Sequence, residues 1–134
     1  MNTQEENISM IKSLYDAFGR RDINGTLAML DPNVELGEPS NPFNPAGGTH
    51  HGHAGFLEWA NIGRQSEEIL VLQPLKILTD HDSVAVVGTM KCLALPTGKT
   101  YESDFVHCVT IESGKVTKFQ EFFDTYLAGE AFRQ

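Results

Sequence analysis

The sequence predicts one α+β domain over residues 1–134, with helices first and an antiparallel sheet in the second half. Apolar residues recur at helical spacing from Ile8 to Phe18. After Ile69 the pattern changes to four segments rich in β-branched and aromatic residues, which are 69–79, 83–95, 100–112 and 115–125. Short turn signals separate these segments and favour antiparallel pairing. Both faces of the predicted sheet are partly apolar, so we expect the helices to cover one face and another subunit to cover the other.

Capping residues delimit the expected helices. Thr3 and Glu6 have the spacing of a capping box at the start of a first helix. Asp22 is placed to cap a second helix. The remaining elements expected before the sheet are a helix over 23–30, a short strand at 34–36, a Pro- and Gly-rich loop over 37–53 and a third helix over 54–66.

A two-residue loop at 113–114 sets the predicted register of the last two strands. It pairs His107 with Gln120. Because side chains alternate between faces, one face would carry Met90, Phe105, His107, Gln120, Phe122 and Asp124. The opposite face would carry Leu93, Val106, Cys108, Phe119, Glu121 and Phe123. Two polar side chains on the first face, His107 and Asp124, interrupt an otherwise mostly apolar wall.

Charge and composition argue against several classes of binding partner. The formal net charge is −8, from 18 acidic and 10 basic residues, and the basic residues form no cluster. Nucleic acid and anionic membranes are therefore not expected partners. No apolar stretch approaches the length of a membrane span, and the polar start of the chain does not resemble a signal peptide. Two cysteines make no disulfide framework, so we expect a cytoplasmic protein.

Several segments resemble SnoaL-like proteins. They are LYDAF at 14–18, GRRDINGTLAMLDPNVEL at 19–36, a His-Gly pair before the third helix, and SGKVTKFQEFFDT at 113–125. These proteins belong to the superfamily of nuclear transport factor 2 and ketosteroid isomerase, together with polyketide cyclases, scytalone dehydratase and limonene-epoxide hydrolase. The resemblance implies a cone-shaped roll, in which N-terminal helices pack on a strongly curved mixed sheet and enclose an apolar pocket. It also implies homodimers formed through the outer sheet face.

Asp124 and His107 are the candidate catalytic residues. A carboxylate in an apolar cavity has a raised pKa and is able to take a proton from carbon. The resemblance implies that Asp124 is the general acid/base and that His107 donates a hydrogen bond to a developing enolate. The alternatives are that Asp124 caps a C-terminal helical turn and that His107 is a satisfied core histidine.

Six further residues are the candidate substrate-binding set. The resemblance places Tyr15 where ketosteroid isomerase has a pocket tyrosine, and the others would line the cavity from the third helix and the predicted inner face. Core packing is the alternative for each of them. The set is Tyr15, Trp59, Met90, Phe105, Gln120 and Phe122.

Glu38 and a histidine cluster are weaker candidates. Glu38 falls near the base position of ketosteroid isomerase, but the match needs a short insertion, so we expect a solvated loop glutamate and not a standard steroid isomerase. His50, His51 and His53 have a spacing that is able to chelate a metal. Without a Cys or acidic partner nearby, we expect a loop at the pocket rim, and neither a metal nor a cofactor.

Two functions follow from these observations. The first is a cofactor-independent isomerase, cyclase or lyase that transfers a proton on a small apolar carbonyl compound. The alternative is a non-catalytic ligand-binding domain or a dimeric accessory module of the same fold. The sequence leaves open whether the protein is an enzyme.

Overall fold

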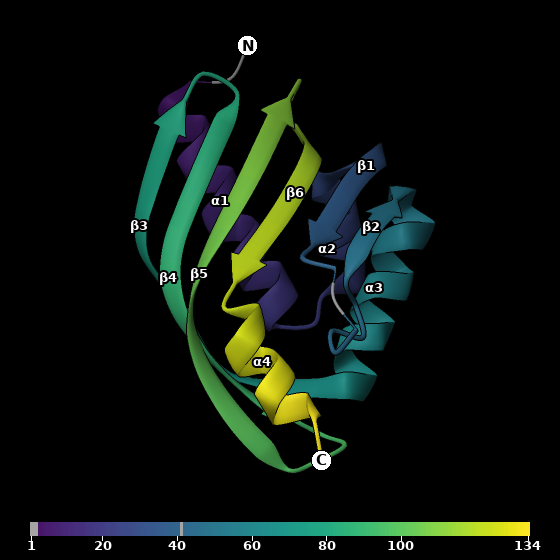
Figure 1. Ribbon diagram of the computed structural model, residues 1–134. Helices are drawn as coiled ribbons and strands as arrows, with labels where there is room; N and C mark the ends of the chain where they lie inside the picture. Colours follow the sequence, from purple (N-terminus) through teal and green to yellow (C-terminus); the bar gives the residue numbers. More distant parts are fainter. Residues whose placement is uncertain (1–2, 41) are drawn as a thin grey trace.

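A six-stranded mixed sheet organises the chain, and the computed structural model describes residues 3–40 and 42–134 (Figure 1). The strand order is β2-β1-β6-β5-β4-β3, and the sheet is not closed. The pair β1 and β6 is parallel, and the other neighbouring pairs are antiparallel. The strands are β1 Leu30–Glu38, β2 Gly48–His51, β3 Glu67–Asp80, β4 Ser83–Ala94, β5 Lys99–Glu112 and β6 Lys115–Phe123. This is the predicted α+β architecture, with four helices against a curved mixed sheet.

The first two helices begin where their capping residues predict, whereas the third begins at Gly52, two residues before the expected start, without a side-chain cap. The Thr3 hydroxyl accepts from the Glu6 backbone N–H, and the Glu6 carboxylate accepts from the Thr3 backbone N–H, which completes the capping box. Asp22 accepts from the Gly25 backbone N–H and caps the second helix. The helices are α1 Gln4–Gly19, α2 Ile23–Met29, α3 Gly52–Ser66 and α4 Thr125–Phe132. None of the helices in the described part of the chain has both the length and the apolar character needed to cross a membrane.

The first strand is longer than the expected segment 34–36. β1 extends to Glu38 because it pairs with β6 on one side and with β2 on the other. Part of the expected loop 37–53 therefore forms strands. Pro32 lies where the pairing of β1 with β6 shifts register, a place where the missing N–H of proline is tolerated.

The register of β6 differs from the prediction by one residue. The loop at 113–114 has the predicted length, and both of its residues have positive φ, as a tight hairpin turn requires. A bulge between Thr110 and Ile111 then shifts the pairing, so His107 lies opposite Glu121 and not Gln120. A shift of one residue turns every side chain to the other face. The inner face of β6 therefore carries Phe119, Glu121 and Phe123, and the predicted inner residues Gln120 and Phe122 lie outside.

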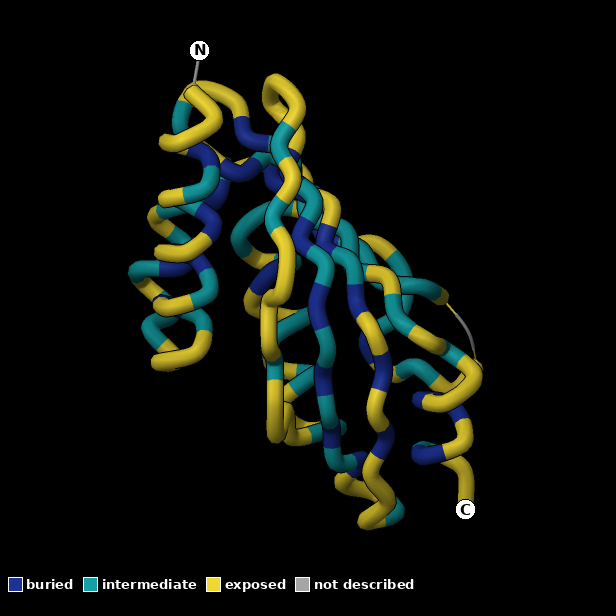
Figure 2. The backbone as a smooth tube through the Cα atoms, turned by 90° about the vertical axis from the view of Figure 1, so that its left-hand side faces the viewer, coloured by how far each residue is buried: buried dark blue, intermediate teal, exposed yellow. Residues whose placement is uncertain are grey.

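Buried residues alternate with half-buried ones along β4, and with exposed or half-buried ones along β5 (Figure 2). The inner side chains fill one end of the fold completely, with Ile11, Val34, Val84, Val109, Ile111 and Val116 at 2% exposure or less. Gly88 on β4 leaves room for the ring of Phe105, which would lie 2.6 Å from a Cβ atom at that position. At the other end the helices and the sheet diverge, and this end holds a cavity.

Candidate functional site

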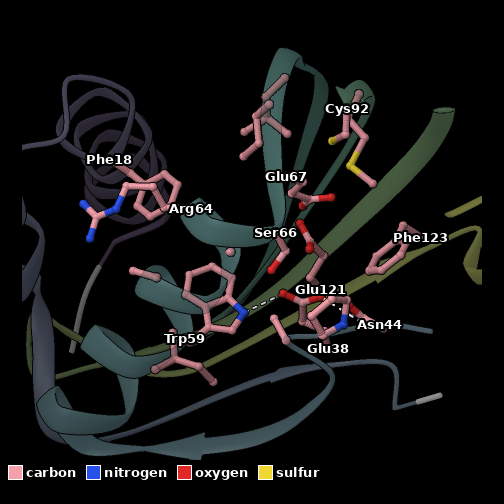
Figure 3. Close-up of a pocket in the computed structure, with 18 of the residues that line it drawn as sticks. Phe18, Glu38, Asn44, Trp59, Arg64, Ser66, Glu67, Cys92, Glu121 and Phe123 are labelled. Carbon is pink, nitrogen blue, oxygen red and sulfur yellow. Dashed lines mark hydrogen bonds between the residues drawn. The ribbon is translucent and has the colours of Figure 1, made fainter. Parts of the chain in front are cut away.

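A cavity of about 730 Å³ lies between the helices and the inner face of the sheet. Its wall is mostly apolar and aromatic, and its few polar side chains come from different elements (Figure 3). A volume and a wall of this kind are typical of small-molecule sites. The aromatic side chains that line it are Tyr15, Phe18, Phe56, Trp59, Tyr101, Phe119, Phe123 and Phe132, together with Phe43.

Glu38 is the acidic group most strongly held in this cavity. The Trp59 indole N–H donates to Oε2 at 2.5 Å, and the Asn44 amide donates to Oε1 at 3.1 Å. Burial, and secondarily the charge of Glu121, raise the pKa of Glu38 to about 7. The expectation of a solvated loop glutamate was wrong, because β1 continues to Glu38 and directs its carboxylate inward. Glu38 therefore has the position and the pKa of a general base at neutral pH.

A chain of hydrogen bonds crosses the cavity wall beside Glu38. The Tyr15 hydroxyl lies 2.6 Å from Nδ1 of His107, and Nε2 of His107 lies 2.6 Å from Oε2 of Glu121. A carboxylate only accepts, so Nε2 carries a hydrogen and donates to Glu121. In the neutral imidazole, Nδ1 then accepts from the Tyr15 hydroxyl. Burial, followed by the charge of Glu121, raises the pKa of Tyr15 well above its ordinary value, which keeps the hydroxyl protonated.

His107 connects Tyr15 to Glu121 in this series of hydrogen bonds, and neither of its ring nitrogens is left for a ligand. Its side chain is 3% exposed and stacks between the rings of Phe105 and Phe119, at centroid distances of 4.4 and 4.8 Å. The structure thus places His107 in the cavity wall. Both of its nitrogens already have protein partners, so the group that it presents to the cavity is the Tyr15 hydroxyl.

Asp124 lies outside the cavity. Its carboxylate accepts from the backbone N–H groups of Tyr126 and Leu127, both at 3.1 Å, and so caps α4. Its own N–H donates to the Ser103 hydroxyl at 2.8 Å. The side chain is exposed and does not line the cavity. The structure therefore corresponds to the helix-cap alternative and separates Asp124 from His107.

The predicted substrate-binding set is divided by the structure. Tyr15, Trp59 and Met90 line the cavity, while the remaining three members do not. Phe105 is 1% exposed and packs behind His107. Gln120 and Phe122 lie on the outer face because of the bulge in β5, and Phe122 is 49% exposed.

Two acidic residues of the cavity escaped the sequence analysis. Glu121 faces inward only because the bulge shifts the register. Glu67 faces inward from the junction of α3 and β3, and its Oε2 accepts from the Tyr101 hydroxyl at 2.7 Å. Burial, partly offset by the Tyr101 hydrogen bond, raises the pKa of Glu67. A sequence signal that could have identified Glu67 is its place at the helix-to-strand change, just before the apolar segment that begins at Ile69.

Two histidines of the cluster, His50 and His53, contact the backbone. His50 and His53 each place Nε2 near a carbonyl oxygen, that of Ala46 at 3.1 Å and that of Leu30 at 3.0 Å. None of the three histidines lines the cavity. Within residues 3–40 and 42–134, no group of three or more His, Cys, Asp or Glu side chains has a geometry able to hold a metal ion.

Comparison of the chain with known proteins identifies its family. The family model described as SnoaL-like domain matches residues 11–119, most of the chain. The chain belongs to the SnoaL-like domain family. Among the curated proteins, no sequence matches this SnoaL-like chain.

Solved structures agree with this assignment. An NTF2-like protein from Burkholderia xenovorans is 30% identical, with a TM-score of 0.90 and 98% of each chain covered. TerC, crystallised with polyporic acid, is 32% identical, with a TM-score of 0.83 and coverage of 96% of this chain and 99% of TerC. A candidate polyketide cyclase from Xanthomonas campestris shares the fold, at 16% identity, with a TM-score of 0.81 and coverage of 97% and 98%.

Proposed function

We propose that this SnoaL-like protein is a cofactor-independent isomerase, cyclase or lyase that transfers a proton on an apolar carbonyl compound. The observation that carries the proposal is Glu38, a carboxylate with a pKa of about 7 inside an aromatic cavity. A base is most effective when its pKa lies near the working pH, because it is then both ionised and basic. The co-crystallisation of the similar protein TerC with polyporic acid supports the proposal that this protein binds a small organic compound.

The proposed step uses Glu38 and Tyr15. The Glu38 carboxylate takes a proton from the carbon next to the substrate carbonyl, and the electron pair of the broken C–H bond moves onto the carbonyl oxygen as an enolate. The protonated Glu38 then returns the proton to another atom of the substrate. Trp59 and Asn44 hold the carboxylate in place through this exchange.

The enolate oxygen receives its hydrogen bond from Tyr15. In the free protein the Tyr15 hydroxyl donates to Nδ1 of His107, and Nε2 of His107 donates to Glu121. As the enolate forms, the Tyr15 hydroxyl turns its hydrogen from Nδ1 to the enolate oxygen, while its oxygen stays beside His107. His107 acts through Tyr15 in this scheme and is a positioning residue.

The test is hydrogen–deuterium exchange at carbon. We expect the protein to accelerate exchange of the α-hydrogens of 2-tetralone in D₂O at neutral pH, followed by proton NMR. Glu38→Gln should lower this acceleration by about 100-fold or more, because the variant has no base. Asp124→Asn is the matched control, an exposed carboxylate outside the cavity, and should exchange at the wild-type rate. Equal exchange by the wild type and Glu38→Gln would refute the proposal.

A second candidate is a binding protein without chemistry. The largely apolar wall favours it, because such a wall would retain an aromatic ligand without any proton transfer. Thermal unfolding with 2-tetralone separates the two. A raised Tm without accelerated exchange would identify a carrier, whereas a raised Tm with exchange that depends on Glu38 would identify an enzyme.

A further inference from the structure

Glu67 is a second carboxylate of the cavity, and the proposed proton transfer does not use it. It lies where α3 ends and β3 begins, and its backbone N–H donates to the Gly63 carbonyl. The cavity lining also includes Ser66, Glu68 and Ile69, which lie beside Glu67 in the sequence, and Met90, Cys92 and Tyr101 of β4 and β5. In Figure 3, Glu67 and Cys92 lie at one side of the group of acidic side chains, and Trp59 lies at the other.

With Glu67 ionised, the hydrogen-bonding capacity left to its carboxylate is that of an acceptor. Oε2 accepts from Tyr101, and in the described part of the chain no protein group donates to Oε1. The hydrogen of the Tyr101 hydroxyl is used in this bond, so Tyr101 also has only lone pairs to offer. Burial raises the pKa of the Cys92 thiol to about 12, which keeps it neutral and a weak donor. A ligand group seated at Glu67 therefore has to donate a hydrogen bond.

The position of Glu67 is fixed before a ligand arrives. Tyr101 is 7% exposed, and its ring packs against Phe132 of α4 at a centroid distance of 6.5 Å. The Tyr101 hydroxyl thus holds Oε2 from a buried and packed side chain. Because the acceptor is already held in place, binding a donor costs little additional conformational entropy of the Glu67 side chain. Glu38 differs, because protein donors already hold both of its oxygens.

We propose that Glu67 determines specificity by accepting a hydrogen bond from a hydroxyl group of the substrate. The inference rests on the proposed function, because it takes the cavity as the substrate site. The substrate class is then a hydroxylated aromatic carbonyl compound, with its reacting carbon at Glu38 and its hydroxyl group at Glu67. A hydroxyl fits better than an ammonium group, because the surrounding wall is largely apolar and a full charge would lose its hydration there. A methyl ether at the same place has no hydrogen to donate and leaves the carboxylate oxygen without a partner.

The test compares two ligands that differ in this donor and in one methyl group, so the change of their affinity ratio in the Glu67 variant is the decisive readout. The probes are 6-hydroxy-2-tetralone and 6-methoxy-2-tetralone, and calorimetric titration gives the ratio of their affinities. We expect the wild type to prefer the hydroxyl compound by about 10- to 100-fold, the range for one hydrogen bond to a charged group. Glu67→Gln still accepts from Tyr101 but turns an amide donor toward the ligand. In that variant the preference should fall below about 3-fold or reverse.

Glu38→Gln is the matched control, because it removes a different carboxylate of the cavity. This variant should keep the wild-type ratio of affinities for the two probes. Equal binding of the two probes by the wild type would overturn the role of Glu67. An unchanged ratio in Glu67→Gln would overturn it as well, including the case in which both affinities fall together through a structural defect. Exchange of the α-hydrogens of 6-methoxy-2-tetralone reports separately on the proposed function. It should persist in Glu67→Gln and be lost in Glu38→Gln.

Discussion

At the residue scale, the surroundings of two carboxylates, Glu38 and Asp124, decide which one is suited to catalysis and which one stabilises the fold. Glu38 is partly buried, is held by Trp59 and Asn44, and has a pKa of about 7. Asp124 is exposed, and its carboxylate accepts hydrogen bonds from two backbone N–H groups at the N-terminus of α4. Both are acidic and both lie where a strand ends, Glu38 as the last residue of β1 and Asp124 directly after β6, so residue type and position along the chain do not distinguish them. Burial and hydrogen-bond partners do, and these favour Glu38 as the base.

The pKa of Glu38 should respond to its neighbour. The charge of Glu121 is the second cause of the raised pKa, after burial. Glu121→Gln removes that charge, so the pKa of Glu38 should fall but stay above its ordinary value. Carbon-13 NMR of the glutamate side-chain carboxyl groups measures it. A pKa of Glu38 that is unchanged or higher in Glu121→Gln would contradict this account.

Tyr15 and His107 should act as one unit. Tyr15→Phe and His107→Gln should each slow the exchange of 2-tetralone by about 10- to 100-fold, because each removes the supported hydroxyl donor. If His107 acts through Tyr15, the double variant should exchange within about 3-fold of Tyr15→Phe. Rates that multiply in the double variant would show instead that His107 acts on its own. Thermal unfolding of the three variants controls for loss of structure.

At the element scale, one bulge decides which residues enter the cavity. The hairpin at 113–114 was predictable, because a Ser-Gly pair between two β-rich segments is typical of a tight turn. The shift between Thr110 and Ile111 was not, because no Gly or Pro marks it and both registers give a partly apolar face. Its consequence is large, since it brings Glu121 inward and turns Phe122 outward. The first two helices were predicted well because local capping bonds define their starts.

The role of Asp124 belongs to this scale. Asp124→Ala should lower the free energy of unfolding by about 1 kcal/mol, because two backbone N–H groups at the start of α4 lose their acceptor. Asp124→Asn keeps an acceptor oxygen and should retain most of the stability. Chemical denaturation measures both. A fully stable Asp124→Ala, or a loss of exchange activity in Asp124→Asn with the fold intact, would return Asp124 to a catalytic role.

At the scale of the whole molecule, the outer sheet face carries apolar side chains. Phe122 and Leu78 are both 49% exposed, and Val71 is 46% exposed. On the pairing of the strands, Val71 and Leu78 lie on the same face as Lys91 and Ala85, opposite to the cavity. We propose that a second copy of the chain covers this face, in agreement with the dimer that the family resemblance implies. Mixed charges such as Lys91 and Glu102 on the same face suit pairing with an identical surface.

The dimer is testable by changing Phe122. Phe122→Ser on this face should shift the mass in solution, measured by light scattering, from dimer toward monomer. Tyr126→Ser is the matched control, because Tyr126 is a similarly large aromatic residue, 73% exposed on α4, away from the sheet face. A wild-type protein that is monomeric at micromolar concentration would rule out this assembly.

The dependence of exchange on pH tests the central claim most directly, which is that Glu38 is the base in the cavity. The active form of Glu38 is the carboxylate, and its pKa is about 7. The exchange rate of 2-tetralone, corrected for the uncatalysed reaction, should therefore be low in acid, rise through about pH 7 and level off above it. In Glu38→Gln this rise should disappear. A rise centred near the ordinary glutamate pKa, or one that persists in Glu38→Gln, would contradict the account.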